Sequence, residues 1–463
     1  MAPKFGTSGL RGLVTELTQD LVQDYTRAFL AACPTGGAVF VGRDLRPSSP
    51  DIANWVMQAV ETTGVPVRDC GVLPTPALAL AAGQAGCAAV MVTGSHIPAD
   101  RNGLKFYTPQ GEILKEDEAK ILSGLGAQHQ QAPAPDRQTV DALSGYEDRY
   151  SEAYGAVALR GFRIGVYQHS SVARDAMMDV VQALGAEAIA LARSDQFIPV
   201  DTEALDSETR DMLAGWCREH GLDAVISTDG DADRPMVADA SGRIVAGDVL
   251  GAITARSLGA QIICTPVSSN SMIGSMSEFD RVTLTRIGSP YVIAAMEQVL
   301  AQDPGAKVIG YEANGGFLLG FAASAPAGVL APLMTRDCLL PVIAPLAEAR
   351  AQGISLADLV AGLPPRFTAA DRVTETPTDL SKAFLAEMTA SADKRAAFFA
   401  DMGPESEVDT TDGLRVRFDS GDIVHLRPSG NAPEFRCYAE AASADRATAL
   451  VHSFMARLKT TLS

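Results

Sequence analysis

The sequence predicts an α/β protein built from three similar α/β units, followed by a smaller α+β unit at the C-terminus. Strand-like and helix-like runs alternate through the first three-quarters of the 463 residues, which is the pattern of α/β units. A chain of this length is also too long for one hydrophobic core. Breaks in composition place the four predicted units at residues 1–140, 141–242, 243–364 and 365–463.

Short apolar runs predict buried strands at residues 38–42, 87–92, 163–167 and 260–265. Helix-like segments follow them at 51–64, 171–185 and 289–302. The last unit instead has extended runs at 414–418, 422–427 and 435–440 and a helix from about residue 444. Pro-containing stretches at 128–138 and 349–367 mark two boundaries, and a subtler break lies near Gly242.

Composition narrows the classes of partner. The net charge of -18 argues against a general affinity for nucleic acid or for an anionic membrane, so anionic substrates would need local clusters of Arg and Lys. The seven cysteines contain no C-x-x-C pair, which fits free thiols in a reducing compartment. The N-terminal residues lack an apolar signal segment and no run approaches a membrane span, so we expect a cytoplasmic protein.

The segment DGDADR follows a predicted strand at 223–228 and carries three carboxylates, those of Asp229, Asp231 and Asp233. Ligands of open α/β sheets bind beyond such strand ends. Clustered carboxylates repel one another unless a cation lies among them, and hard oxygen donors suit Mg²⁺. A solvated acidic turn has the same pattern and remains an alternative. An EF-hand fits less well, because its sixth and twelfth positions would be Arg234 and Ala240.

Ser95 follows the predicted strand 87–92 and is expected on an exposed loop, where it is a candidate nucleophile. Gly94 would let the backbone approach a neighbour closely. An ordinary turn serine is the alternative. The surrounding residues do not form a G-x-S-x-G elbow, and the adjacent His96 is expected to point elsewhere.

Basic residues gather in three loops that suit a phosphate monoester: Arg11 in GTSGLRG, Arg43 and Arg46 in GRDLRPSSP, and the segment RPSGNAPEFR at 427–436. For the last segment a plain hairpin with incidental arginines is the alternative. Nucleotide and zinc chemistry lose support, since neither a P-loop, a dinucleotide fingerprint nor zinc-ligand spacing is found.

The loop YEANGGF at 311–317 offers Glu312 and Asn314 for vicinal sugar hydroxyls, while Gly315 and Gly316 leave room for a ring. A hairpin turn would have the same composition, so this segment alone is weak.

Together these loops resemble the α-D-phosphohexomutase family, in particular its phosphomannomutase and phosphoglucomutase members. The resemblance rests on FGTSGLRG, GRDLRPSSP, VTGSHIPADRNGLKFY, DGDADR, YEANGGF and RPSGNAPEFR, in that order along nearly the whole chain. It implies mixed sheets in the three α/β units and a central cleft surrounded by all four units. It also implies Mg²⁺ as cofactor, a hexose 1,6-bisphosphate as activator, a hexose monophosphate as substrate, and a monomer or homodimer.

The resemblance implies roles by position. Ser95 would be the phosphorylated nucleophile and, with Asp229, Asp231 and Asp233, would complete the Mg²⁺ site. Lys105, Arg11 and His96 would be further catalytic residues, with Lys105 the acid/base candidate, and Arg234 would neutralise the phosphoserine. Glu312, Asn314 and Arg286 would bind the sugar. The non-reacting phosphate would be bound by Arg427, Ser429, Gly430, Asn431 and Arg436.

The chain also departs from the pattern of the family. Ile97 replaces the usual Asn, Gly94 replaces Ala, Arg286 stands where many members have Lys, and Asn431-Ala432 replaces Thr-Glu. Gly316 falls where the sugar-loop His often lies. The nucleophile and metal ligands are intact, whereas the identity of the acid/base and the sugar preference stay open.

The implied reaction moves a phosphoryl group between O1 and O6 of a hexose through a 1,6-bisphosphate, with the C-terminal unit closing as a lid. Mannose 6-phosphate and mannose 1-phosphate are the expected pair. A phosphoglucomutase or dual-specificity enzyme is the main alternative, and phosphoglucosamine mutase a weaker one. A Mg²⁺-dependent sugar phosphatase and a non-catalytic sugar-phosphate-binding protein are less consistent with the motifs.

Overall fold

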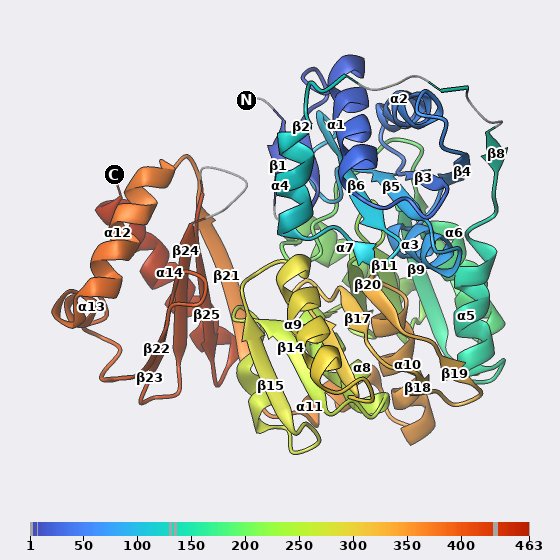
Figure 1. Ribbon diagram of the computed structural model, residues 1–463. Coiled ribbons are helices and arrows are strands. Elements are labelled where there is room, and N and C mark those ends of the chain that lie inside the picture. Colours follow the sequence, from blue (N-terminus) through green and yellow to red (C-terminus); the bar gives the residue numbers. More distant parts are fainter. Residues whose placement is uncertain (1–2, 7, 129–131, 134–136, 429–433, 463) are drawn as a thin grey trace.

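The computed structural model describes residues 3–6, 8–128, 132–133, 137–428 and 434–462. It contains three α/β units with mixed sheets and a C-terminal unit with an antiparallel sheet, so the predicted fold class is confirmed (Figure 1). Within these residues no helix is both long and apolar enough to cross a membrane. All seven cysteines lie in the described part of the chain and are free thiols.

The first unit is an eight-stranded sheet in the order β1-β2-β6-β5-β3-β4-β8, with β7 paired to β6. The strands β3, β4, β5 and β8 run parallel, whereas β6 is antiparallel to β5. Its elements are β1 Lys4–Phe5, β2 Leu10–Leu13, α1 Gln19–Ala32, β3 Val39–Arg43, α2 Ser49–Glu61, β4 Val67–Val72, α3 Thr75–Gln84, β5 Ala88–Val92, β6 Arg101–Thr108, β7 Gly111–Glu112, α4 Lys115–Ser123 and β8 Gln138–Thr139.

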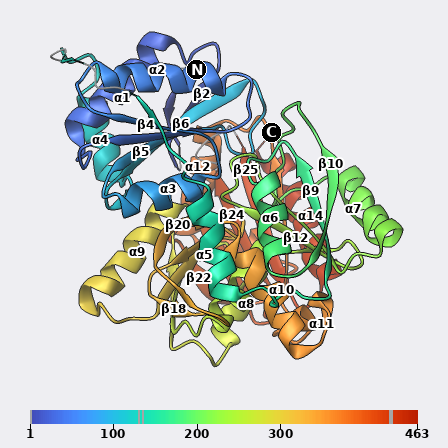
Figure 2. The ribbon, with the colours of Figure 1, turned by 90° about the vertical axis from the view of Figure 1, so that its right-hand side faces the viewer.

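The second unit has the strand order β10-β9-β11-β12-β13, in which β9 lies parallel to β10 and β11. Helix α5 also packs on α3 of the first unit and on α6, and Figure 2 shows it running beside α6. The elements are α5 Ser144–Tyr154, β9 Arg163–His169, α6 Arg174–Ala183, β10 Glu187–Arg193, α7 Ser207–His220, β11 Ala224–Thr228, β12 Pro235–Asp239 and β13 Ile244–Val245.

The third unit repeats this plan with the order β15-β14-β16-β17-β20 and a small β18–β19 hairpin. Strand β14 is parallel to β15 and β16, and β17 is antiparallel to its neighbours. The elements are α8 Gly247–Ser257, β14 Ile262–Pro266, a 3₁₀ turn Ser271–Ser275, β15 Arg281–Thr285, α9 Ser289–Gln302, β16 Val308–Tyr311, β17 Phe317–Leu319, β18 Ala323–Ser324, β19 Val329–Leu330, β20 Leu333–Asp337, α10 Leu340–Gln352 and α11 Leu356–Ala361.

The C-terminal unit is an antiparallel sheet in the order β21-β25-β24-β23-β22. Helix α14 packs on β21 and β25, and α12 packs on β24. The elements are β21 Phe367–Val373, α12 Thr378–Ala390, α13 Ala392–Phe398, β22 Glu405–Asp409, β23 Leu414–Phe418, β24 Ile423–Pro428, β25 Phe435–Ala441 and α14 Ala444–Thr461.

The first three units share one hydrophobic core, whereas the C-terminal unit has a separate one. One cluster of buried side chains runs continuously from Ala38 in the first unit to Leu363 at the end of the third. The C-terminal unit has a separate core of its own, from Phe384 to Leu458. Its described contacts with the third unit include hydrogen bonds: Ser271 N–H donates to Glu440 at 2.9 Å, and the Asn270 amide to the Arg366 carbonyl at 2.9 Å. Figure 1 accordingly shows this unit set to one side.

The predicted elements are present, with shifted ends. Helix α2 begins at Ser49 rather than at residue 51, since Pro50 suits the first turn of a helix. Helix α6 begins at Arg174 rather than at 171, because the Ser171 hydroxyl accepts the Ala173 N–H and holds a turn there. In the stretch 128–138, residues 129–131 and 134–136 lie outside the described residues.

Candidate active site

Three carboxylates lie together on the turn after β11. The side chains of Asp229, Asp231 and Asp233 are fully buried, and one ligand oxygen of each lies within 4.8 Å of the others. Ala232 has a φ of 58°, a left-handed conformation that a tight turn requires. The turn closes on its first carboxylate, since Asp229 Oδ1 accepts the N–H groups of Asp233 at 3.2 Å and Arg234 at 3.3 Å. Burial therefore overturns the alternative of a solvated acidic turn.

The donor set of this turn fits a hard divalent cation. Asp231 Oδ1 and Asp233 Oδ1 are buried and have no hydrogen-bond partner. Such oxygens are costly to bury unless something coordinates them. Burial raises the pKa of the Asp229 carboxyl well above its ordinary value, and the charges of Asp231 and Asp233 raise it further. A cation such as Mg²⁺ among these oxygens would favour the ionised form.

Counter-charges reach this turn from both neighbouring units. Lys105 Nζ, on β6 of the first unit, lies 2.5 Å from Asp231 Oδ2 and also contacts Asp233. Arg336, on β20 of the third unit, lies 2.6 Å from Asp233 Oδ2. Although burial raises the pKa of the Asp231 carboxyl, the charge and hydrogen bond of Lys105 outweigh it and the net shift is downward. The sequence analysis did not identify Arg336. The one sequence feature that could have drawn attention to it is that Arg336 and Asp337 are adjacent charged residues in the short strand β20.

Ser95 is not on an exposed loop as expected. Its exposed fraction is 4%, because the loop after β5 packs against the Asp229 turn. The Ser95 hydroxyl donates to Asp229 Oδ2 at 2.6 Å, and its N–H donates to Thr93 Oγ1 at 2.7 Å. Its φ of 53° is unusual for a residue other than glycine. The first unit thus brings one hydroxyl directly against the carboxylates of the second.

The prediction that His96 points away from Ser95 is wrong. His96 Nδ1 lies 3.3 Å from the Ser95 hydroxyl oxygen. The charge of Arg234 lowers the pKa of His96 well below its ordinary value, and burial and Arg11 lower it further. The lowered pKa favours the neutral imidazole, whose Nδ1 faces the Ser95 hydroxyl.

Arg46 was expected to serve a phosphate, but its guanidinium is committed to the protein. It is 1% exposed and pairs with Asp44 at 3.1 Å. Its remaining donors hold the loop that carries Ser95 through four backbone carbonyls, those of Ser95 at 2.7 Å, Ile97 at 2.6 Å, Pro98 at 2.7 Å and Arg101 at 3.0 Å. The expected close approach at Gly94 is confirmed, because a Cβ there would lie 2.4 Å from the Arg46 guanidinium carbon.

Two further arginines lie beside the same loop. Arg11 donates to the carbonyl of Thr93, and burial lowers its pKa. Arg234 lies 3.7 Å from Glu203 and 3.9 Å from Asp233, and its Nε is buried without a hydrogen-bond partner. Arg11 and Arg234 therefore place two positive charges around Ser95 and His96.

The loop 311–317 follows β16 and forms a tight turn in the third unit. Gly315 has a φ of 86° and donates its N–H to the Glu312 carbonyl at 2.9 Å. The Asn314 side-chain oxygen accepts the Gly316 N–H at 2.9 Å, which fixes the orientation of the side chain and leaves its NH₂ group as a donor for a ligand. Glu312 is 4% exposed and pairs with Arg336 at 3.4 Å. The turn is thus tied to the carboxylate cluster through Arg336.

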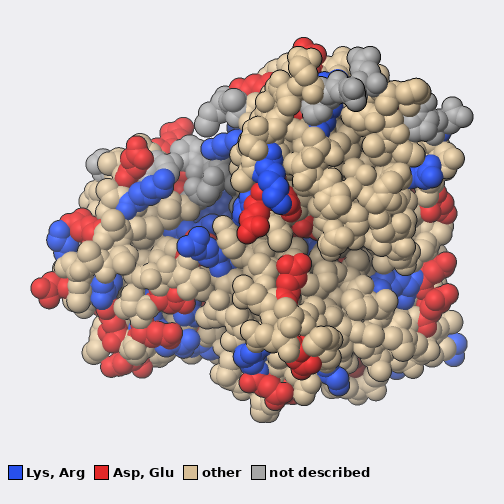
Figure 3. Space-filling model, in the orientation of Figure 1, with Lys and Arg blue, Asp and Glu red and all other residues tan. Residues whose placement is uncertain are grey.

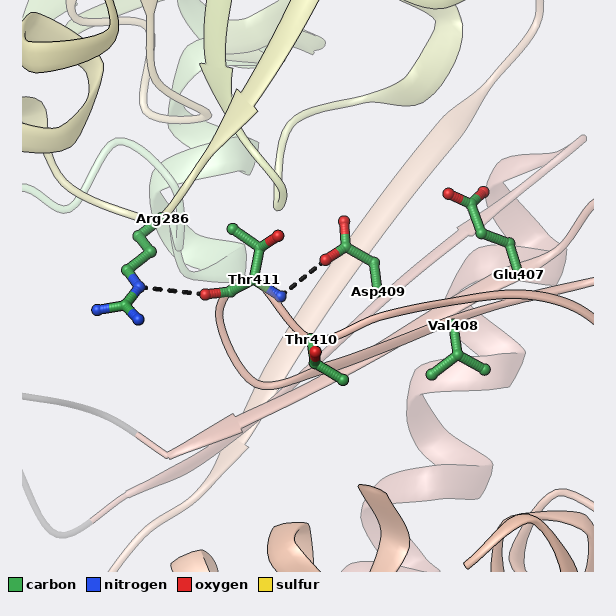
Figure 4. A pocket seen from close by; sticks show the side chains of 6 residues that line it. All are labelled: Arg286, Glu407, Val408, Asp409, Thr410 and Thr411. Atoms are coloured by element: carbon green, nitrogen blue, oxygen red, sulfur yellow. Dashed lines mark hydrogen bonds between the residues drawn. The ribbon is translucent and has the colours of Figure 1, made fainter. Parts of the chain in front are cut away.

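A cleft of about 410 Å³ opens where the first, third and C-terminal units meet. Lys115, Arg286 and Arg427 line it, one from each unit, and Figure 3 shows Lys and Arg side chains gathered along this hollow. Arg286 Nε donates to the Thr411 carbonyl at 3.3 Å across the boundary, as Figure 4 shows for the adjoining pocket. Asp412 holds Arg427 at 2.8 Å. The cleft has the charge that an anionic ligand needs.

Of the predicted phosphate residues, Arg427 lines this cleft and Arg436 contacts Glu434 at 3.4 Å. Ser429, Gly430 and Asn431 lie outside the described residues.

Comparison with known proteins agrees with this arrangement. Four sequence models of the phosphoglucomutase/phosphomannomutase family match consecutive parts of the chain: α/β/α domain I over residues 2–132, domain II over 145–242, domain III over 246–367 and the C-terminal domain over 373–457. The chain belongs to the phosphoglucomutase/phosphomannomutase family. The four matched regions follow the order of the four units described above, and the third ends at Phe367, the first residue of β21.

Relatives and solved structures cover the whole chain. A phosphomannomutase of Sinorhizobium fredii is 43% identical over 100% of both chains, and one of Salmonella muenchen is 41% identical over 99% of this chain and 96% of its own. A phosphoglucomutase/phosphomannomutase family protein of Burkholderia thailandensis has a similar fold, with a TM-score of 0.77, 22% identity, and coverage of 98% of this chain and 97% of its own.

The first prediction concerns Arg46, as the support of the Ser95 loop. Arg46→Lys keeps the charge but cannot serve four carbonyls, and each buried polar group left unpaired costs about 1–3 kcal/mol. We expect the free energy of unfolding to fall by about 3 kcal/mol and the loop 93–101 to become sensitive to protease. Arg43→Lys, at the end of β3 just before the loop that carries Arg46, is the control. Identical unfolding curves for the two variants would contradict this role.

Proposed function

We propose that this chain is a phosphohexomutase that interconverts mannose 6-phosphate and mannose 1-phosphate through a phosphoserine at Ser95. The observation that carries the proposal is the 2.6 Å hydrogen bond from the Ser95 hydroxyl to Asp229, which joins the serine of one unit to the carboxylate turn of the next. Full-length relatives at 43% and 41% identity are named phosphomannomutase, which supports this choice of substrate.

In the first half-reaction a hydroxyl oxygen of the sugar monophosphate attacks the phosphorus of phospho-Ser95. The bond from phosphorus to Ser95 Oγ breaks, and the products are free Ser95 and the hexose 1,6-bisphosphate. The bisphosphate then turns end for end, and its other phosphoryl group passes to Ser95 Oγ by the reverse steps. The reaction is redox-neutral, and a hexose 1,6-bisphosphate would also charge Ser95 initially.

Each transfer moves one proton from the attacking hydroxyl. Lys105, bound beside Asp231 and Asp233, is the acid/base candidate. His96 is a second participant, since its neutral imidazole lies 3.3 Å from Ser95 Oγ. Arg11 and Arg234 neutralise charge around the phosphoserine, since phosphoryl transfer depends on positioning and electrostatics. Asp229, Asp231 and Asp233 hold Mg²⁺, which when bound offsets the negative charge of the transferring phosphoryl group.

The remaining residues position the substrate. Glu312, Asn314 and Arg286 bind the sugar. Arg427, which lines the cleft, and Arg436 hold the non-reacting phosphate. Ser429, Gly430 and Asn431 are assigned to the same phosphate by the family motif, and they lie outside the described residues. The C-terminal unit closes over the bisphosphate as a lid, which its separate core permits. We propose that the protein is cytoplasmic, which its seven free thiols support. By the family resemblance we expect a monomer or a homodimer.

Glucose phosphates are the second candidate substrate, because the matched family includes phosphoglucomutases and the two sugars differ only at C2. The proposal expects kcat/KM for mannose 1-phosphate to exceed that for glucose 1-phosphate. The assay supplies each sugar with Mg²⁺ and its 1,6-bisphosphate and follows the 6-phosphate formed. A higher kcat/KM for glucose 1-phosphate would show that glucose phosphates are the preferred substrates, and the proposed mechanism would stay the same.

Ser95→Ala should abolish turnover without unfolding the protein, because it removes the oxygen that carries the phosphoryl group. Intact mass of the active wild type should show one phosphate that maps to Ser95, and incubation with labelled hexose 1,6-bisphosphate should label only chains with Ser95. Ser123→Ala, which changes an exposed serine of the same unit, is the control. Undiminished activity in Ser95→Ala would exclude the phosphoserine mechanism.

Asp231→Asn should weaken cation binding and lower kcat by about 10²–10³-fold, because one ligand charge is lost where the transferring group is stabilised. Binding of Mn²⁺ measured by electron paramagnetic resonance gives a readout independent of turnover. Asp195→Asn changes an exposed carboxylate of the same unit and serves as control. Equal Mn²⁺ affinity in the wild type and Asp231→Asn would show that the cation binds elsewhere.

A further inference from the structure

Arg336 connects two loops that the proposed function uses separately. Its guanidinium lies 2.6 Å from Asp233 on the cation turn and 3.4 Å from Glu312 on the sugar loop. Its exposed fraction is 6%, so it is held inside the protein rather than at the surface. It extends from β20, which pairs with β17 directly after the sugar loop.

The charge of Arg336 is matched by carboxylates from three units. Burial lowers its pKa, but Asp233, Glu312 and Glu112 outweigh burial and hold the pKa well above the ordinary value of arginine. A guanidinium is permanently charged and presents a planar fork of donors, which suits two carboxylates at once. A lysine at this position would offer a point charge in place of that fork.

Gly316 makes room for this side chain. A Cβ at residue 316 would lie 2.8 Å from both Cγ and Cδ of Arg336, a distance that real Cβ atoms do not show. Gly316 does not have a positive φ, unlike Gly315, so its backbone conformation alone does not require glycine. Glycine at 316 is therefore explained by the arginine at 336. A histidine at 316, which the resemblance led us to look for, would collide with it.

We propose that Arg336 is a positioning residue for sugar recognition, which fixes the Glu312 carboxylate for the sugar hydroxyls and ties it to Asp233. This inference rests on the proposed function, since it takes Glu312 as a sugar ligand. The Arg336 side chain occupies the space that a histidine at residue 316 would need, and it brings a positive charge to the sugar loop. It does not transfer protons, because arginine does not give up its proton in proteins. Arg336 can take this position only because residue 316 is glycine.

The test compares two ligands by isothermal titration in a Ser95→Ala background, where turnover cannot occur. Arg336→Met should bind mannose 6-phosphate about 10–100-fold more weakly, the effect of losing a charge-assisted contact. Inorganic phosphate should bind within about twofold of the parent, because the proposed phosphate residues are unchanged. Arg336→Lys should recover part of the loss. Arg256→Met, which removes a partly buried 2.7 Å ion pair with Glu348 elsewhere in the third unit, should bind both ligands normally.

A second comparison tests the steric contact between residues 316 and 336, and its first variant leaves the charge of Arg336 in place. Gly316→Ala should weaken mannose 6-phosphate binding about tenfold when Arg336 is present, because the new methyl displaces it. In an Arg336→Ala background, where Cγ and Cδ are gone, the same substitution should cost less than about twofold. Gly316→Ala by itself keeps the inference testable if the Arg336 variants fail to fold, and unchanged mannose 6-phosphate binding in Gly316→Ala would overturn it.

The outcomes separate this inference from the proposed function. Unchanged mannose 6-phosphate binding in Arg336→Met, equal weakening of both ligands, or additive effects of the 316 and 336 substitutions would each overturn the role of Arg336. Failure of the wild type to interconvert sugar monophosphates would instead overturn the mutase, whatever Arg336 does. Selective loss of sugar binding with non-additive substitutions supports the inference.

Discussion

Burial of three carboxylates on one short turn is the constraint on which the rest of the site depends. Asp229, Asp231 and Asp233 are removed from water, and like charges at such distances raise one another's proton affinity. Two positively charged side chains from other units offset this repulsion, Lys105 from the first unit and Arg336 from the third. The cluster therefore holds charges of the first three units in one place, and the same units share a continuous core.

The serine loop shows how the fold prepares a hydroxyl for such a turn. Ser95 has a left-handed backbone and its loop is held at four carbonyls by Arg46. Gly94 allows the guanidinium to lie directly on the backbone. Arg46 thus fixes the conformation of the loop and is not free to bind a ligand. The positive charge around Ser95 comes from Arg11 and Arg234 instead. Rigid support of the loop is what brings the hydroxyl to 2.6 Å from Asp229.

The C-terminal unit relates differently to the other three. It has its own hydrophobic core, and polar contacts such as those of Asn270, Ser271 and Asp412 cross its boundary. Contacts of this kind can be exchanged for water at modest free-energy cost, whereas a shared core cannot. The lid proposed above would need such a boundary, whereas the carboxylate cluster depends on fixed contacts between the first three units.

The sequence by itself determined the order of the elements, the α/β class and the loops that carry the chemistry. These features are local: apolar periodicity marks strands and helices, and short motifs mark the loops at their ends. It also singled out the three aspartates, Ser95 and Glu312 by residue type. Helix ends were off by two or three residues at α2 and α6, because the first-turn proline and a serine turn decide them.

Only the tertiary structure decided which side chains meet. Ser95 and Asp229 are 134 residues apart, and no local pattern reports that one is buried against the other. Arg46 was expected at a phosphate and instead binds backbone carbonyls, while Arg336 had no motif and proved to join two loops. Burial and pairing depend on the packing of one unit against the next, which charge and spacing along the chain do not record. That is the physical reason that motifs could mark candidate residues such as Ser95 and Asp229, whereas the contacts between them could not be predicted from the sequence.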